Sequence, residues 1–179
     1  MRRTGILMVF TAALFLAGCP YKAEHRLGAP SAKTFDEGLI GNWVSCEPGK
    51  ADACAHLSVF RFNEGEYYAE LSGIEREGAN RNIRINTDRY KAFMTNIGVP
   101  GLLDVQELSA STEPSKAHFY VKAEPAAEHT IKLSYMSDNF TKAQFSSPEE
   151  FAAHLKANDA KKDFYETLPL FVPKSSRNF

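Results

Sequence analysis

The stretch Leu57-Ser58-Val59-Phe60-Arg61-Phe62, followed by Asn63-Glu64-Gly65-Glu66 and then by Tyr67-Tyr68-Ala69-Glu70-Leu71, decides the fold of this chain. The two outer runs are rich in aromatic and β-branched residues, which favour strands. The four residues between them are polar and contain glycine, as in a tight turn. Two such runs joined by a short turn predict a β-hairpin.

The same pattern recurs further along the chain. Ile83 and Ile85 alternate with polar residues, as on a half-buried strand. Residues 90–97 and 102–108 flank the turn-forming stretch 98–101, and residues 118–123 and 130–136 flank a connection at 124–128. In this last hairpin the inward positions are expected at Phe119, Val121, Ile131 and Leu133. The succession predicts a mainly β fold, an antiparallel meander that closes into a small barrel or a tightly folded sheet and so removes exposed strand edges.

One short C-terminal helix interrupts the strands. Ser147-Pro148-Glu149-Glu150 has the form of a capping box with proline at the first helical position, and Phe151 and Leu155 are spaced to pack over the sheet. Residues 168–172, interrupted by Pro169, are expected to form an edge strand or an extended arm. The β-barrel-like domain is predicted over residues 38–173, with a flexible tail at 174–179.

The N-terminus has the features of an export signal. Arg2 and Arg3 precede an apolar run at residues 6–16, which has the roughly 7 to 15 residues typical of secretory signals and is too short for a permanent transmembrane helix. Residues 1–18 are therefore predicted to be a signal peptide that is removed. An ordinary signal peptide and an uncleaved membrane anchor are the alternatives.

The four residues Leu16-Ala17-Gly18-Cys19 resemble the lipobox of bacterial lipoproteins. In that pattern a branched apolar residue stands three positions before the cysteine, and two small residues let a peptidase reach the bond before it. The resemblance implies that Cys19 is acylated and holds the protein on a bilayer, since two or more chains give stable anchoring. Pro20 departs from the aspartate that favours retention at the inner membrane, which favours the periplasmic face of the outer membrane.

Residues 19–37 are predicted to form a lipidated tether. They mix proline, glycine, serine and charged residues without apolar periodicity. A flexible chain of that length has a root-mean-square span of about 20 Å. We expect the domain to stay close to the lipid surface.

Charge limits the classes of partner. The full chain has a formal net charge of −1, and removal of the signal with Arg2 and Arg3 leaves 19 cationic and 22 acidic residues in 161 residues, a net charge of −3. Nucleic-acid binding would require a cationic excess on one face, and this net charge does not predict one.

The length of the chain suits one domain.

The two remaining cysteines, Cys46 and Cys54, are expected to form a disulfide in an oxidising compartment. Closing so short a loop contributes about 2 to 3 kcal/mol in the chain-entropy model. A redox or metal-binding pair is the alternative, but there is no C-x-x-C motif and His56 alone does not complete a zinc site.

Leu39, Gly41 and Trp43 form an L-x-G-x-W pattern that resembles the first strand of lipocalins and of lipocalin-like bacterial lipoproteins. The resemblance implies a barrel with the tryptophan plugging one end. The order of hairpins followed by a late Ser-Pro-Glu-Glu helix is similar to that of small, poorly characterised bacterial lipoproteins.

No motif predicts catalysis, a cofactor or a metal site. His118 and His129 could face each other across a hairpin as a weak metal site, and Ser72-Gly73 lacks the surroundings of a nucleophile elbow. Glutamates around the first hairpin suit a solvated face: Glu64, Glu66, Glu70, Glu75 and Glu77. A second group suits a charged edge or a contact with anionic lipid or protein: Arg81, Arg84, Arg89 and Lys91.

Several aromatic residues could line a ligand cavity or simply fill the barrel: Phe60, Phe62, Tyr67, Tyr68, Phe93, Phe119 and Tyr120. The leading hypothesis is a non-enzymatic, lipid-anchored periplasmic β-domain that binds another envelope component, an envelope protein of unknown identity, or serves as an accessory subunit. A lipocalin-like carrier of a small apolar ligand is the first alternative. A lysozyme-inhibitor-like lipoprotein is the second, supported by the dipeptide Ser72-Gly73 alone.

Overall fold

We describe the protein from a computed structural model, which defines residues 21–46, 54–77, 82–108, 117–126, 129–137, 144–161 and 163–174. For residues 74–77 and 82–84 only the backbone is considered.

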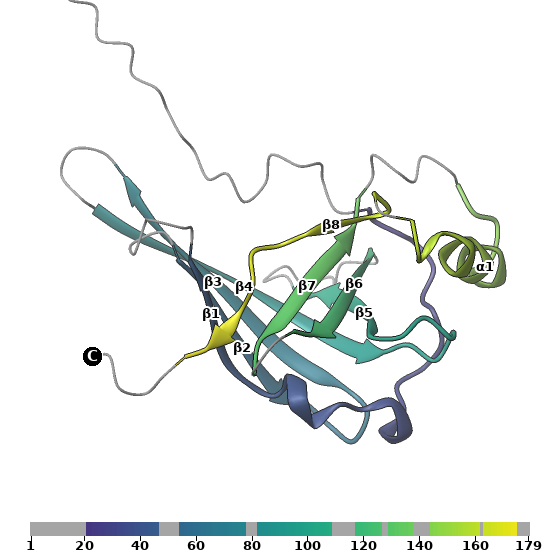
Figure 1. Ribbon diagram of the computed structural model, residues 1–179, viewed down its shortest axis with the longest axis horizontal. Coiled ribbons are helices and arrows are strands. Elements are labelled where there is room, and N and C mark those ends of the chain that lie inside the picture. The colour runs from purple at the N-terminus through teal and green to yellow at the C-terminus, as the bar shows by residue number, and fades with distance from the viewer. Residues whose placement is uncertain are drawn as a thin grey trace, which may run out of the picture.

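The described residues form one antiparallel sheet and three short helices (Figure 1). The strands are β1 Gly41–Cys46, β2 Cys54–Arg61, β3 Tyr67–Glu77, β4 Asn82–Met94, β5 Leu102–Glu107, β6 His118–Pro125, β7 Ile131–Met136, β8 Tyr165–Thr167 and β9 Val172–Pro173. The 3-10 helices η1 Ala32–Thr34 and η2 Glu37–Leu39 precede β1, and α1 Pro148–Asn158 lies between β7 and β8. The strand order is β8-β7-β6-β5-β4-β3-β2-β1-β9, so each strand from β1 to β7 pairs with the next one in sequence, and β9 pairs with β1.

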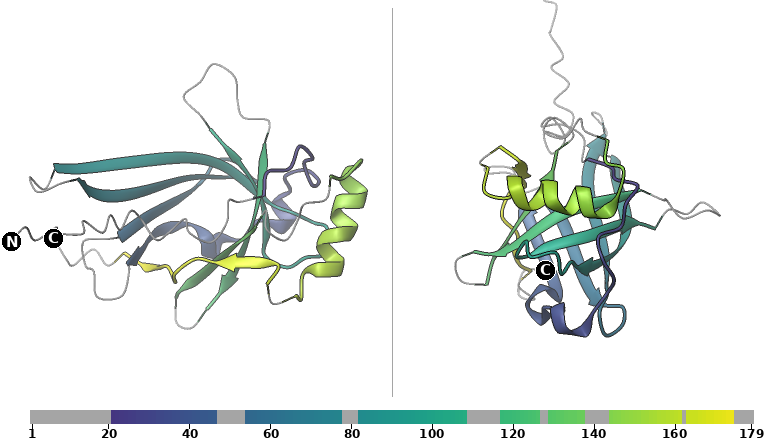
Figure 2. Two further views of the ribbon diagram at one scale, coloured as in Figure 1. Left: turned by 90° about the horizontal axis from the view of Figure 1, so that it is seen from above. Right: turned by 90° about the vertical axis from the view of Figure 1, so that its right-hand side faces the viewer.

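The last strands close the sheet. Residues 165–167 pair with β7, Phe171 and Ile131 exchange two backbone hydrogen bonds of 3.0 Å, and β9 pairs with β1. One extended segment therefore bonds to both ends of the sheet and completes a small lipocalin-like barrel, as predicted (Figure 2). The edge strand or extended arm expected at residues 168–172 is observed as an extended segment in which Leu168 and Phe171 bond to β7 and Val172 begins β9.

Pairing register divides each strand into inward and outward positions, because directly opposed residues share a face. The inward residues form the barrel core, which has Trp43 near the start of β1 and Phe171 on the closing segment. Its other buried members are Leu39, Ala55, Leu57, Val59, Tyr67, Ala92, Leu103, Ala123 and Ile131. Phe119 opposes Val105, and Val121 opposes Leu103, so the inward positions predicted for β6 are confirmed.

A second core lies outside the barrel. Helix α1 begins at the capping residue Ser147, whose Oγ accepts the N–H of Glu150 at 3.2 Å, and it buries Phe151 and Leu155 completely against the sheet. The remaining buried members are Ala23, Leu27, Val99, Leu102, Tyr120, Met136 and Phe164. In the described part of the chain no helix is long and apolar enough to cross a membrane.

One end of the barrel is sealed by side chains. Trp43 donates its indole N–H to the carbonyl of Leu39 at 3.1 Å, which holds η2 across this end. Beside it the ring of Phe35 stacks on Tyr67 at 4.4 Å, and the guanidinium of Arg61 lies 4.1 Å over the Phe35 ring. We call this the sealed end and the opposite one the far end.

Removal of the Phe171 ring should open the barrel core. Phe171 is 2% exposed, whereas its neighbour Leu170 is 53% exposed. We expect Phe171→Ala to lower the free energy of unfolding by about 3 to 5 kcal/mol, since it leaves a cavity in the closing strand. The matched control Leu170→Ala should change it by no more than about 0.5 kcal/mol. Urea denaturation measures both, and equal effects would contradict closure by this segment.

Candidate functional site

The two cysteine predictions have different outcomes. Cys46 and Cys54 form a disulfide between the last residue of β1 and the first of β2, which oppose each other in the register, so the predicted bridge is confirmed. Leu16, Ala17, Gly18 and Cys19 lie outside the described residues. The processing and lipidation site therefore stays a prediction.

The segment that follows is packed rather than free. The backbone N–H of Tyr21 donates to Met136 at 2.8 Å, and Ala23 and His118 exchange two hydrogen bonds of 2.9 Å. Ala23 and Leu27 are 4% and 1% exposed. Residues 21–31, which we call the strap, thus lie along the barrel wall and differ from the mobile tether expected at 19–37.

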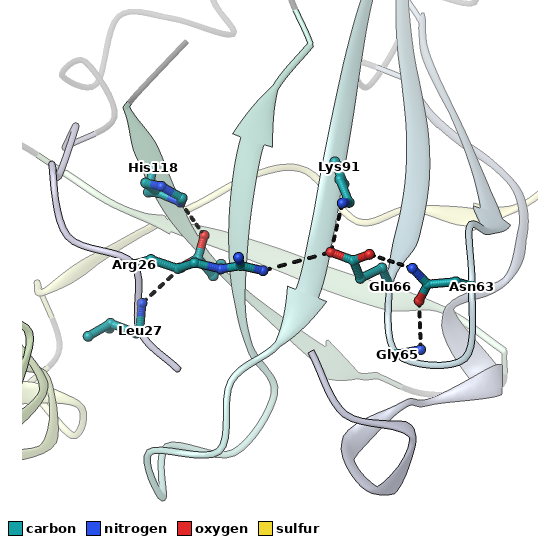
Figure 3. Close-up of polar contacts among 8 residues, drawn as sticks. Arg26, Leu27, Asn63, Gly65, Glu66, Lys91 and His118 are labelled. Atoms are coloured by element: carbon teal, nitrogen blue, oxygen red, sulfur yellow. Dashed lines mark hydrogen bonds and ion pairs between the residues drawn. The ribbon is translucent and has the colours of Figure 1, made fainter. Parts of the chain in front are cut away.

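Asp104 holds the middle of the strap. Its carboxylate is 1% exposed and points outward from β5, beneath the strap. Oδ2 accepts the backbone N–H of Leu27 at 3.0 Å, and Oδ1 contacts Nδ1 of His118 at 2.6 Å (Figure 3). Because a carboxylate accepts here, Nδ1 carries the proton in this contact. The hydrogen bond from Leu27 to this buried carboxylate holds the strap at one position along β5.

Tyr120 and His25 extend this network. The Tyr120 hydroxyl donates to the carbonyl of His25 at 2.5 Å and lies 3.3 Å from Asp104 Oδ2. Burial raises the pKa of the Tyr120 hydroxyl far above its ordinary value, and the charge of Asp104 raises it further. The phenol therefore remains a donor at any physiological pH. Nε2 of His25 in turn lies 2.9 Å from the carbonyl of Phe145, ahead of α1.

A second buried carboxylate lies nearer the sealed end. Glu66, 6% exposed, accepts Lys91 Nζ at 2.9 Å and the side-chain amide of Asn63 at 2.5 Å. Arg26 of the strap lies 3.7 Å from the same carboxylate (Figure 3). Its guanidinium covers the ring of Phe93 at 4.6 Å. Glu66 was expected on a solvated face, and that expectation is wrong, because two cations and an amide compensate its burial.

The strap ends against the turn between β2 and β3. An added Cβ at Gly65 would lie 2.7 Å from the backbone nitrogen of Ser31, so only glycine allows this approach. Since β7 ends at the far end and the β2–β3 turn is at the sealed end, the strap crosses the whole wall between Tyr21 and Ser31.

These networks bind groups of the protein itself. The carboxylate oxygens of Asp104 contact the strap and His118, and those of Glu66 contact Lys91, Asn63 and Arg26. Among the residues with described side chains, no three or more histidines, cysteines or acidic groups are placed to hold a metal ion. The pairing of His118 with His129 is also wrong: His118 contacts Asp104, while His129 lies in the β6–β7 turn with φ of 58°.

The predicted aromatic lining divides between the two faces. Tyr67 and Phe119 point inward, as their register partners do, and Phe93 and Tyr120 are buried beneath the strap. Three others lie on the outer surface next to the sealed end, which we call the aromatic surface: Phe60, Phe62 and Tyr68. Phe60 and Phe62 are 47% and 56% exposed, and the rings of Phe60 and Tyr68 lie 6.2 Å apart.

The barrel interior is less completely packed than the core beneath the strap. Leu102, Met136 and Leu155 are fully buried outside the barrel, whereas several inward apolar residues of the barrel are only half-buried. This second group consists of Ala69, Leu71, Val105, Phe119 and Leu133. Burial raises the pKa of the inward-facing Tyr90 hydroxyl to about 12, with Asp88 and Glu107 adding to the effect.

Comparison with protein-family models, with curated proteins and with solved structures found no match for this chain. The evidence on function therefore consists of the sequence motifs and the contacts described for the barrel and the strap.

Acid should weaken the contacts of Glu66. Burial alone would raise the Glu66 pKa, but the hydrogen bonds from Lys91 and Asn63 and the charges of Lys91 and Arg26 outweigh it and hold the pKa below its ordinary value of 4.5. The ionised form therefore contributes stability that is present above pH 4.5 and is lost as the pH falls through the lowered pKa.

We expect Glu66→Gln to reduce the free energy of unfolding at neutral pH. In this variant the free energy of unfolding should also fall less steeply than in the wild type as the pH is lowered. Glu64→Gln, in the same turn but exposed, should keep the wild-type profile. Urea denaturation between about pH 7 and pH 3 compares the three proteins. A flattened profile in Glu64→Gln, or an unchanged one in Glu66→Gln, would refute the assignment.

Proposed function

We propose that this protein is a lipid-anchored lipoprotein of the bacterial cell envelope, held through acylated Cys19 on the periplasmic face of the outer membrane. The observation that carries the proposal is the Leu16-Ala17-Gly18-Cys19 motif behind a cationic and apolar leader. The disulfide Cys46–Cys54 supports it, because such bonds persist in oxidising compartments.

The domain acts by binding rather than by catalysis. The aromatic surface offers a contact area of the type that is enriched at protein interfaces, with Phe60 and Phe62 about half exposed. It lies at the sealed end, opposite the end where the strap begins with Tyr21. A lipid anchor at Cys19 would therefore leave this surface facing away from the bilayer, where an envelope protein can reach it.

Replacement of Cys19 tests the anchor. In cells given a palmitate analogue, we expect Cys19→Ala to abolish labelling and to prevent release of the signal by the lipoprotein peptidase. The paired variant Cys46→Ala, Cys54→Ala is the matched control: it loses the disulfide but should keep the label, because those residues are not lipid acceptors. Labelled Cys19→Ala protein would refute the proposal.

A second candidate function is carriage of a small apolar ligand in the barrel. The observation that favours it is the partial burial of inward residues such as Leu71 and Leu133 in the barrel. We expect native mass spectrometry of the full protein to detect a co-purified apolar compound, and Leu133→Trp to displace it by filling the lumen. Lys132→Trp, on the outer face of the same strand, is the control. Protein free of ligand in every preparation would reject this function.

A further inference from the structure

Two carboxylates are placed on the inner face of the sheet. Asp88 of β4 opposes the inward Leu71, and Glu107 of β5 opposes the inward Tyr90. In the described part of the chain neither carboxylate forms a hydrogen bond or an ion pair. Their charges add to the effect of burial that raises the pKa of the Tyr90 hydroxyl to about 12, so both carboxylates lie near this hydroxyl. We call Asp88 and Glu107 the inner acidic pair.

The other inward charges do not neutralise this pair. Glu166 of β8 also faces inward, and its carboxylate accepts the Tyr135 hydroxyl at 2.8 Å. Among the described inward positions of the strands the one cation is Arg61, which lies at the sealed end and pairs with Glu37. The interior of the barrel therefore favours a ligand that brings its own positive charge.

A buried hydroxyl on the inner face lacks a partner as well. Ser45 of β1 is 5% exposed, opposes the barrel-core residue Ala55, and has no hydrogen bond at its Oγ. Ala55 in turn opposes Gly73, where an added Cβ would meet no atom of a non-adjacent residue within 4 Å. Buried hydroxyl groups are normally hydrogen-bonded. A polar group of a ligand that occupies the open space over Gly73 could supply the missing partner of Ser45.

Apolar side chains lie beside these polar groups. Leu71 precedes Gly73 by two residues on β3, and Val105 precedes Glu107 by two residues on β5, and both are half-buried although they face inward. Accessible apolar walls with a few polar groups are typical of small-molecule sites. Ca²⁺ and Mg²⁺ need more oxygen ligands than two carboxylates provide, and no three or more histidines, cysteines or acidic groups with described side chains are placed to hold a metal ion. An organic cation fits this mixture better.

We propose that the barrel interior binds a cationic amphiphile, with an ammonium group at the inner acidic pair, an apolar stem along Leu71 and Val105, and a second polar group at Ser45. This inference rests on the second candidate function, carriage of a ligand in the barrel, and names the chemical class of that ligand. Ser45 and Asp88 lie on strands three spacings apart, roughly 14 Å along the sheet. A dodecyl chain is long enough to reach both.

Two probes that differ at one end test the ammonium contact. ω-Hydroxydodecylammonium and ω-hydroxydodecanoate share the stem and the hydroxyl end but carry opposite charges. Calorimetric titration uses the full chain in one non-ionic detergent at low salt and neutral pH, so that partitioning into micelles is common to all variants. We expect the wild type to bind the ammonium probe at least about tenfold more tightly than the carboxylate probe, because the inner acidic pair attracts one and repels the other.

The paired variant Asp88→Asn, Glu107→Gln should reduce this preference to within about twofold. The matched control Asp163→Asn, Glu64→Gln removes the same two charges from exposed positions outside the barrel and should keep the preference. Ser45→Ala should weaken both probes by about threefold or more, since they share the hydroxyl end. No charge preference in the wild type, or an undiminished one in Asp88→Asn, Glu107→Gln, would overturn the inference, and unchanged binding in Ser45→Ala would overturn the contact assigned to that hydroxyl.

The same preparations separate this inference from ligand carriage itself. Leu133→Trp, which fills the lumen, should block both probes. Binding of both probes without a charge preference but with that block would keep carriage and reject the inference alone, and so would a co-purified compound that has no cationic group. If neither probe binds and no compound co-purifies, carriage and the inference are rejected together.

Discussion

The buried carboxylate of Asp104 is the contact on which the organisation of this molecule depends. It takes the backbone N–H of Leu27 and the ring of His118, and so fastens the strap to the outer wall of the barrel. The strap in turn covers Tyr120 and other apolar residues that would otherwise face water. A buried carboxylate without such donors would be costly, so the strap and Asp104 stabilise each other.

The alternation of residues along the strands predicted the inner core well. The period of two identified the inward positions on β6 and β7, and the capping signals placed α1. Both features are local, since they depend on neighbours in sequence. The L-x-G-x-W pattern likewise agrees with a barrel in which Trp43 and Leu39 contact each other at one end.

The outer core and its polar contacts were not predictable in the same way. Asp104 accepts from a residue 77 positions away, and Arg26 lies over Phe93 from a segment whose composition resembles a linker. Pattern analysis assigns such residues to solvent, because it cannot identify a distant segment that covers them. The one available signal was the run Leu102-Leu103-Asp104-Val105, in which apolar residues on both faces suggest a strand buried on both sides.

The docked strap also changes what an anchor at Cys19 would do. A free chain over residues 20–37 would let the barrel tumble above the bilayer, whereas the contacts of Tyr21, Ala23 and Leu27 remove that freedom. Sealing one end with Trp43 and the stack of Arg61, Phe35 and Tyr67 then makes the two ends chemically different. An oriented domain with different ends can present its aromatic surface to one compartment only. If Cys19 is acylated as proposed, the buried contacts of the strap would convert that attachment point into a defined orientation.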